Sequence, residues 1–323
     1  MVKIILLKTW IENIGNAIID MGTYSCLRKA FPKSEIYEVS GYSNFLFEKT
    51  NPGDSVFYLD LYKTIINFPR ILANNLRDGP PYQQNCLNIG ELLDADFAVF
   101  PGCTLYEYAL NKYLPTLEKL RKKNIEIIFL GAGGGNYEPS TINFIKKVFK
   151  KLNPKALITR DSDAFKNYSN DVKLSFNGID CGFFINDWFK PPKIKDSFIA
   201  CSFDKISEPE INTSGKIIRL HHHQFAHKEE FFQKPNTLIS DNVKDYLTIY
   251  SNASETHSDR VHACVASLSY DTPSRLYFGS PRAKLFENVT KKDITNELVK
   301  LDTVKINTLK REQIKIIKEV IKK

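Results

Sequence analysis

The sequence predicts an α/β protein with two domains that face each other across a cleft. The chain has 323 residues, which is too long for one ordinary hydrophobic core and suits two domains of roughly 150 residues each. Short runs rich in β-branched residues alternate with amphipathic segments of helical period, a pattern typical of βαβ units and a parallel sheet. The composition, with 42% hydrophobic and 25% charged residues, is that of an ordinary globular protein.

The first domain is predicted over residues 1–190. It begins with a strand, a glycine turn and a helix, and the alternation then continues along the chain. Strands are expected at 2–7, 35–39, 55–59, 96–102, 125–130 and 156–159, and helices at 17–30, 105–122 and 139–152.

The second domain is predicted over residues 191–323. The proline-rich, basic stretch at 189–193 is the best candidate for the linker between the two domains. After it we expect strands at 198–203, 216–220, 248–250 and 275–278, followed by a lysine-rich helix at 306–321 that we assign to this domain.

The composition also limits the expected location of the protein and its expected binding partners. The apolar runs are far shorter than the roughly 20 residues of a membrane span, and the chain starts in a strand-like run rather than a signal-peptide pattern, so we expect a cytoplasmic protein. A net charge of +8 favours anionic partners, such as phosphorylated metabolites or an anionic membrane surface in peripheral contact. No recognition motif supports a nucleic-acid partner. The six cysteines form no CxxC pair and are expected to be reduced core thiols: Cys26, Cys86, Cys103, Cys181, Cys201 and Cys264.

The stretch 255–268 combines a helix start with functional side chains. Ser258 is a suitable N-cap and Asp259 an acidic first-turn residue, and the apolar residues that follow repeat with the period of a buried helix face. Free N–H groups at the helix start, with Arg260 and His262, suit a phosphate or a carboxylate. Because residues two apart point in nearly opposite directions, Arg260 and His262 can share a ligand only over the helix end.

Turns at predicted strand ends supply further candidates. Arg160 stands with Asp161 and Ser162 at the end of a strand, where open α/β sheets bind ligands; its fork suits a carboxylate or phosphate, and the alternative is a surface pair with Asp161 or Asp163. Ser162 is expected to cap the following helix. The glycine run 131–135 lacks the G-x-G-x-x-G spacing of a dinucleotide site and is either a tight turn or a ligand-facing loop. The candidate cleft-loop residues are Gly15, Asn16, Gly102, Gly131 and Gly133.

The histidines at 221, 222, 223 and 227 raise the question of a metal. They follow a predicted strand, so His221 and His223 would share one face. No Cys, Asp or Glu at suitable spacing completes a tetrahedral site, so we predict no metal and interpret His221 and His223 as residues that line the cleft.

Taken together, these motifs resemble the polysaccharide pyruvyl transferase family. The resemblance rests on 13–16 with its helix, 96–102, 131–133, 159–162, Asp180 and 258–263, and its most specific parts are the Arg-Asp-Ser turn and the Ser-x-Arg-x-His-Ala segment. It departs from the family where Val261 replaces the usual Leu and where Asn16 replaces a common Asp.

The resemblance implies a fold, a reaction and a set of site residues. Members of the family have a GT-B-like pair of Rossmann-like domains and transfer the enolpyruvyl group of phosphoenolpyruvate onto two sugar hydroxyls as a pyruvate ketal, without metal or other cofactor. Arg160 and Arg260 would hold the donor, with Val261 and Ser258 beside them, and His262 would be the acid/base. The acceptor would be a sugar of a polysaccharide or of a lipid-linked glycan precursor.

Two rival functions follow from the same architecture. A nucleotide-sugar glycosyltransferase shares a GT-B fold, but Glu255 is the only acidic candidate near the expected nucleotide site and no E-x-x-x-x-x-x-E spacing follows it. A non-catalytic sugar-binding protein would keep the cleft without needing His262.

Overall fold

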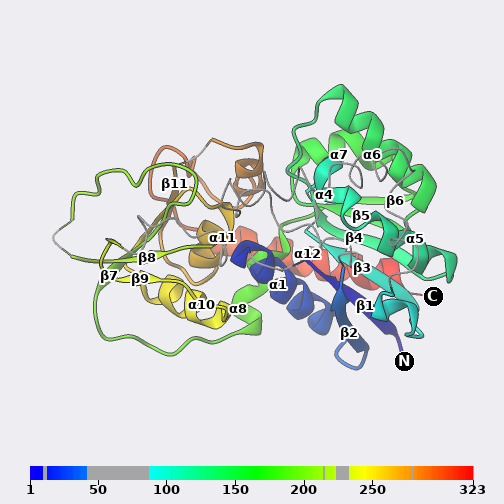
Figure 1. The fold of residues 1–323 in the computed structure, drawn as a ribbon, viewed down its shortest axis with the longest axis horizontal. Helices are drawn as coiled ribbons and strands as arrows, with labels where there is room; N and C mark the ends of the chain where they lie inside the picture. The colour runs from blue at the N-terminus through cyan, green and yellow to red at the C-terminus, as the bar shows by residue number, and fades with distance from the viewer. Residues whose placement is uncertain are drawn as a thin grey trace, which may run out of the picture.

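The computed structural model describes residues 1–9, 13–41, 87–102, 104–213, 215–222, 233–277 and 279–322, and it consists of two α/β lobes side by side (Figure 1). The strand expected at 55–59, together with Cys86, Cys103, His223 and His227, lies outside the described residues. The described cysteines, Cys26, Cys181, Cys201 and Cys264, are buried free thiols, as predicted.

The first lobe is built on a six-stranded parallel sheet of order β2-β1-β3-β4-β5-β6. Its strands are β1 (Lys3–Lys8), β2 (Glu35–Ser40), β3 (Phe97–Pro101), β4 (Glu126–Ala132), β5 (Ala156–Thr159) and β6 (Leu174–Asn177). The order reverses between β1 and β3. In open parallel sheets such a switch point opens a crevice at the carboxyl ends of the strands, where ligands bind.

Helices cover both faces of this sheet. They are α1 (Ile14–Ala30), α4 (Glu107–Asn111), α5 (Leu114–Lys122), α6 (Pro139–Leu152) and α7 (Ser162–Tyr168), with 3-10 turns η2 (Ile89–Glu91), η3 (Ser169–Asp171) and η4 (Cys181–Phe184). Apolar residues of α5 and α6 pack on one face, and those of α1 and η4 pack on the other. The single helix expected at 105–122 is two helices, α4 and α5, because Pro115 starts a new helix after the turn at 112–113.

The second lobe holds a five-stranded parallel sheet of order β11-β10-β7-β8-β9. Its strands are β7 (Phe198–Ser202), β8 (Lys216–Leu220), β9 (Thr237–Leu238), β10 (Thr256–Ser258) and β11 (Ser274–Leu276), and its other elements are α8 (Ile185–Trp188), α10 (Val243–Asn252), α11 (Val261–Ser269) and η5 (Pro281–Phe286). This sheet reverses its order between β7 and β10, which gives it a switch point of its own. The strand expected at 248–250 is wrong, because these residues lie within α10.

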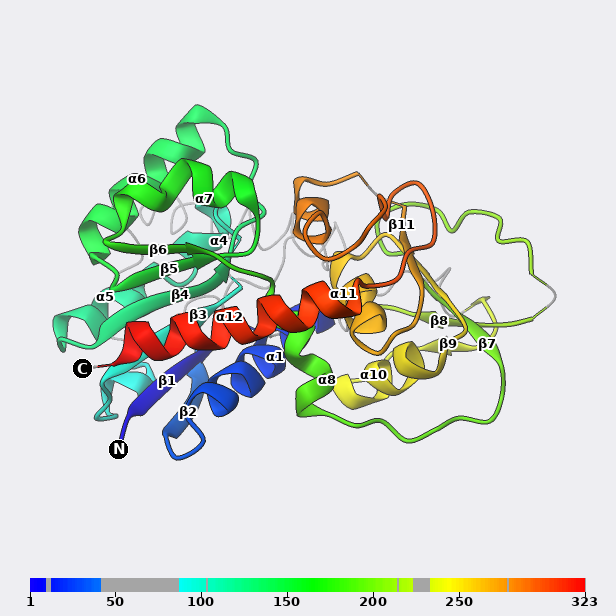
Figure 2. The same ribbon diagram turned by 180° about the vertical axis from the view of Figure 1, so that it is seen from behind.

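The terminal helix α12 (Thr303–Ile321) crosses back to the first lobe, where it runs alongside α1 (Figure 2). Ile306, Ile317 and Val320 belong to the same buried cluster as Ile4 and Leu6 of β1. The buried Gln313 Oε1 also accepts a hydrogen bond from the Ile179 N–H at 2.7 Å. The assignment of this helix to the second domain therefore needs correction, while the boundary at residue 190 stays a prediction.

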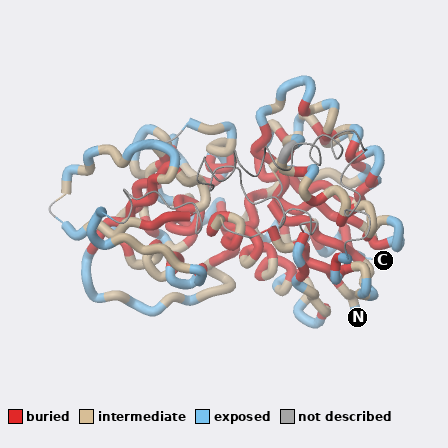
Figure 3. Tube along the Cα trace, in the orientation of Figure 1, coloured by how far each residue is buried: buried red, intermediate tan, exposed pale blue. Residues whose placement is uncertain are grey.

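Helix α1 lies between the two lobes. Ile14, Ala17 and Ile18 pack with buried residues of α10 and α11, whereas Cys26 and Leu27 pack with the first sheet. Figure 3 shows buried residues in both lobes and where they meet. Within the part of the chain that the structure describes, no helix is long and apolar enough to cross a membrane.

Candidate active site

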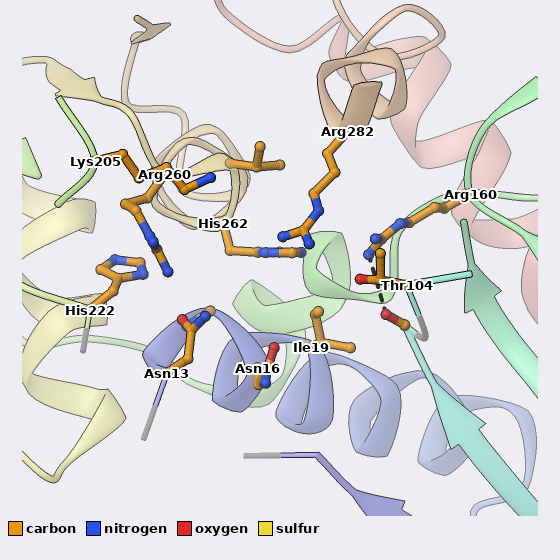
Figure 4. A pocket seen from close by; sticks show the side chains of 13 residues that line it. Asn13, Asn16, Ile19, Thr104, Arg160, Lys205, His222, Arg260, His262 and Arg282 are labelled. Carbon is orange, nitrogen blue, oxygen red and sulfur yellow. Dashed lines mark hydrogen bonds between the residues drawn. The ribbon is translucent and has the colours of Figure 1, made fainter. Parts of the chain in front are cut away.

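A small polar pocket lies between the lobes, where the switch points of the two sheets face each other. From the first lobe it receives the loop after β3, the strand end after β5 and the start of α1; from the second it receives the loops after β7 and β10, the start of α11, and η5 (Figure 4). It is lined by Asn13, Gly15, Asn16, Ile19, Gly102, Thr104, Arg160, Lys205, His222, Arg260, Val261, His262 and Arg282.

Arg160 and His262 meet at one buried carboxylate. Arg160 Nη1 donates to Asp180 Oδ2 at 2.8 Å, and His262 Nε2 lies 3.3 Å from the same oxygen. The side chains of Arg160 and Asp180 are 2% and 0% exposed, so this ion pair is shielded from water. Asp180 stands just before η4, and its Oδ1 accepts from the Gly182 N–H at 2.7 Å, which fixes the carboxylate. The structure thus brings together the predicted arginine of the first lobe and the predicted histidine of the second.

The charges of this group depend on one another. Burial alone would raise the pKa of Asp180, but attraction to His262 and Arg160 holds it well below its ordinary value. Burial lowers the pKa of His262; Asp180 opposes this effect, while Arg160 and Arg282 add to it. The site therefore favours an ionised Asp180, while burial favours the neutral form of His262.

The glycine run holds Arg160 in place. Arg160 Nη2 donates to the Gly133 carbonyl at 3.1 Å, and the Asp161 carboxylate accepts from the Gly134 N–H at 2.8 Å. A Cβ at Gly133 would lie 2.1 Å from Asp161 Oδ2, so the close approach requires glycine there. Gly131 has φ +74° and, like Gly133, is not among the residues that line the pocket.

Asp161, not Ser162, caps α7, since its Oδ1 accepts from the Ala164 N–H at 2.8 Å. The alternative of an Arg160 surface pair with Asp161 or Asp163 is also wrong. Asp163 pairs with Lys284 instead.

The start of α11 differs from the predicted cap. The helix begins at Val261 with Arg260 as N-cap, while Ser258 ends β10. Ser258 Oγ accepts from the Arg260 N–H at 2.8 Å and donates to the Ser202 carbonyl at 2.9 Å, so it holds the backbone of Arg260 but does not line the pocket. Asp259, also before the helix, accepts from the backbone N–H groups of residues 204–206. Arg260, Val261 and His262 all reach the pocket over this helix end, which is the geometry that sharing a ligand requires.

Asp204 organises the side of the pocket formed by the second lobe. Its Oδ2 lies 3.5 Å from Arg260 Nε and accepts from the His222 N–H at 3.2 Å, and its Oδ1 lies 2.9 Å from His221 Nδ1. Burial opposes its ionisation, but the hydrogen bond with His221 and the charge of Arg260 lower the pKa of Asp204 to about 2. His222 lines the pocket and His221 lies behind it on Asp204, so the expectation for His221 is corrected.

The start of α1 forms the floor of the pocket in Figure 4. Asn13 caps the helix, and its Oδ1 accepts from the Gly15 N–H at 2.9 Å. Asn16 Nδ2 donates to the Thr9 carbonyl at 3.1 Å. A Cβ at Gly15 would lie 3.3 Å from both Cβ and Nδ1 of His262, so a side chain here would press on that histidine.

Three charged or titratable lining residues were not predicted: Lys205, His222 and Arg282. His222 was one of the four neighbouring histidines, but alternation along a strand selected His221, which lies behind the pocket, and His223, which lies outside the described residues. Lys205 and Arg282 stand in loops with no motif around them, so their sequence gave no signal. Gly102 and Asn16 do line the pocket.

The pocket is suited to a small anion. Among the lining residues, Arg160, Lys205, Arg260 and Arg282 are cationic and none is acidic. Guanidinium groups bind carboxylate and phosphate through paired, charge-assisted hydrogen bonds. Within the described residues, no group of three or more His, Cys, Asp or Glu side chains could hold a metal ion.

The chain is similar to one known protein family. A family model described as polysaccharide pyruvyl transferase matches residues 13–277. A search of curated proteins gave no significant match.

Among solved structures, a putative UDP-N-acetylglucosamine 2-epimerase from Listeria monocytogenes aligns with a TM-score of 0.52 and 9% identity, over 99% of this chain and 89% of that one. The UDP-N-acetylglucosamine 2-epimerase from Rickettsia bellii aligns with a TM-score of 0.50 and 13% identity, over 98% of this chain and 96% of that one. At these identities the likeness concerns the fold alone, and it agrees with two Rossmann-like domains in a GT-B-like arrangement.

Proposed function

Because the chain belongs to the polysaccharide pyruvyl transferase family, we propose that it moves the enolpyruvyl group of phosphoenolpyruvate onto two hydroxyls of a sugar. The product is a cyclic pyruvate ketal, and inorganic phosphate is released. The acceptor is a sugar of a polysaccharide or of a lipid-linked precursor, and the reaction takes place in the cytoplasm, with peripheral contact between the positively charged protein and an anionic membrane.

One observation carries the proposal: His262 lies in a pocket that has four cationic lining residues and no acidic one. Phosphoenolpyruvate carries a carboxylate and a phosphate on a three-carbon unit, so its charges match the pocket. The reaction also needs an acid near the vinyl carbon, and histidine is the side chain whose ordinary pKa suits this task near neutral pH.

The chemistry proceeds in two halves. His262, protonated when the anionic donor is bound, gives its proton to C3 of phosphoenolpyruvate and leaves an oxocarbenium centre at C2. A sugar hydroxyl attacks C2, and its proton restores His262. The bond between C2 and the phosphate oxygen then breaks, a second hydroxyl attacks C2, and its proton leaves with the phosphate. Of the two hydroxyl protons, one ends on the new methyl group and one on phosphate.

The protein supplies position and charge for these steps. Arg160 and Arg260 bind the anionic groups of the donor, and Ser258 keeps the backbone of Arg260 in place. Asp180 holds the imidazole of His262 and compensates its charge after protonation. Val261 contributes an apolar contact at the start of α11.

The test incubates the protein with phosphoenolpyruvate and a panel of methyl glycosides that have free 4,6- or 3,4-diols. We expect release of phosphate together with a product heavier by the pyruvate ketal, detected by mass spectrometry. The His262→Ala variant should lose this activity while its circular dichroism spectrum and its melting temperature remain those of the wild type.

Two results would change the assignment. An active His262→Ala variant would remove the histidine from the acid/base role. Turnover of a UDP-sugar, with neither binding nor consumption of phosphoenolpyruvate, would favour the nucleotide-sugar glycosyltransferase. A thermal-shift screen of both donors separates these cases, because a ligand that binds only the native state raises the melting temperature.

A further inference from the structure

Arg282 comes from the second lobe, but its side chain packs on the glycine run of the first. A Cβ built on Gly134 would lie 2.9 Å from Arg282 Cγ and 3.0 Å from Arg160 Nη2, so both arginines approach the same backbone position. Gly134 has φ +71°, a conformation that favours glycine. In Figure 4 Arg282 reaches down to the His262 ring and Arg160 enters from the right, so the two guanidinium groups lie in the same part of the pocket.

Two contacts anchor the segment that follows Arg282 to residues of the first lobe. Lys284 forms an ion pair with Asp163 of the first lobe. The Phe286 ring packs edge to face on Phe183, with ring centroids 6.3 Å apart. Arg282 is therefore held in position before any ligand arrives.

The two arginines differ in how their charge is compensated. Arg160 is paired with Asp180 at 2.8 Å. For Arg282, no ion pair with a carboxylate is found among the described residues, and its hydrogen bond is with Tyr106. Burial, with the neighbouring charge of Arg160, lowers the pKa of Arg282. A largely buried cation beside a second cation is unfavourable until an anion bridges them.

The remaining cations lie on the other side of the histidine. Figure 4 shows Arg260 and Lys205 entering opposite Arg160, with His262 between the two groups. The pocket thus has two cationic ends, and phosphoenolpyruvate has two anionic ends with the reacting carbons between them.

We propose that Arg282, together with Arg160, binds the phosphoryl group of the donor, and that Arg260 at the other end binds the carboxylate. The identity of the donor rests on the proposed function. The phosphate subsite itself rests on the two guanidinium groups, and it adds a residue that the family resemblance does not assign.

The experiment tests the two anionic parts of the donor as separate ligands. Orthophosphate and pyruvate are titrated separately against the wild type, Arg282→Gln and Arg282→Lys, with melting temperature as the readout and sodium chloride as the match for ionic strength. Arg311→Gln is the control, because it makes the same change of charge at an exposed arginine. Circular dichroism confirms that each variant is folded.

We expect orthophosphate to stabilise the wild type and Arg311→Gln beyond the effect of chloride. Arg282→Gln should bind orthophosphate about tenfold more weakly or worse, the effect of losing a hydrogen bond between charged groups. Its response to pyruvate should persist. Arg282→Lys, which keeps the charge but loses the fork, should lie between Arg282→Gln and the wild type.

Three results would overturn the proposal: no response of the wild type to orthophosphate, an unchanged phosphate affinity in Arg282→Gln, or an equal loss of the pyruvate response. If Arg282→Gln does not fold, Arg282→Lys decides by the same criteria. Failure of the proposed function gives a different result. In that case orthophosphate still binds through Arg282, but phosphoenolpyruvate is not consumed with any acceptor.

Discussion

At the scale of single residues, the charge of His262 depends on what the pocket holds. In the free protein, burial lowers its pKa, and Arg160 and Arg282 add to this effect although Asp180 opposes it. A bound donor brings negative charge next to the ring and offsets the two arginines, so the pKa of His262 should rise on binding. At pH values between the pKa of His262 in the free protein and its pKa in the complex, binding of the donor therefore takes up a proton. In this pH range the affinity for the donor should fall as pH increases.

Calorimetry with phosphoenolpyruvate can measure this uptake, with buffers of different ionisation enthalpy at one pH. We expect up to one proton bound per donor near neutral pH for the wild type, and little for His262→Gln, whose amide does not titrate. Uptake that survives in His262→Gln would assign the proton to another group, such as the phosphate of the donor. The His257→Gln variant serves as a control, because His257 contacts Glu255 and Tyr277 and does not line the pocket.

The pocket-lining residues that stand in a local pattern could be predicted from the sequence. Arg160 and His262 lie next to a strand end and a helix start, and these contexts mark ligand positions in α/β proteins. Arg282 could not be found in this way, because its place in the pocket depends on contacts with Gly134 and Tyr106, more than 100 positions earlier in the chain. Asp180 was part of the family resemblance, but its link to both Arg160 and His262 became visible only in three dimensions.

At the scale of elements, helix α1 carries two glycines whose replacement by alanine should have different effects, one on stability and the other on the site. A Cβ at Gly22 would lie 2.1 Å from the Cys181 carbonyl oxygen, which belongs to the backbone of η4 and cannot give way. Gly22→Ala should therefore destabilise the protein by about 1–3 kcal/mol or more. At Gly15 the nearest atoms belong to the side chains of Asn13 and His262, at 3.1 and 3.3 Å, and these can shift.

Gly15→Ala should accordingly impair the site with little effect on stability. The better helix propensity of alanine, worth up to about 1 kcal/mol, offsets the crowding. Displacement of His262 should lower turnover of phosphoenolpyruvate by about tenfold or more. Urea denaturation and phosphate release separate the two quantities. The assignment of Gly15 to the site would be wrong if its alanine variant lost stability as Gly22→Ala does and kept full turnover.

The spacing of apolar residues predicted most helices and strands, because each element must present an apolar face to the core. The helix at 139–152 and the strand at 156–159 have the expected bounds. The error at 248–250 has a physical cause. Thr248, Ile249 and Tyr250 favour a strand locally, but α10 buries Tyr246, Leu247 and Tyr250 on one face of a helix, so packing overrides local propensity.

At the scale of the whole molecule, one buried cluster runs through both lobes. It joins Ile4 and Leu6 of the first sheet to Val265 of α11, Phe286 of η5 and Ile317 of α12. The boundary near residue 190 was predicted from a proline-rich stretch. Such a local signal does not show that apolar residues from the last third of the chain complete the core of the first lobe.

The first lobe should therefore not fold without the end of the chain. We expect a fragment of residues 1–190 to lack a cooperative urea transition, because the side chains that α11, η5 and α12 contribute to the buried cluster would be missing and the rest of the cluster would be exposed to water. The full chain should unfold in one transition, with coincident far- and near-ultraviolet circular dichroism. Adding residues 303–323 as a separate peptide should restore only part of the structure, since the contacts of α11 and η5 remain absent. A sharp, reversible transition of the 1–190 fragment alone would show instead that the first lobe is an autonomous domain and that the shared cluster contributes little to its stability.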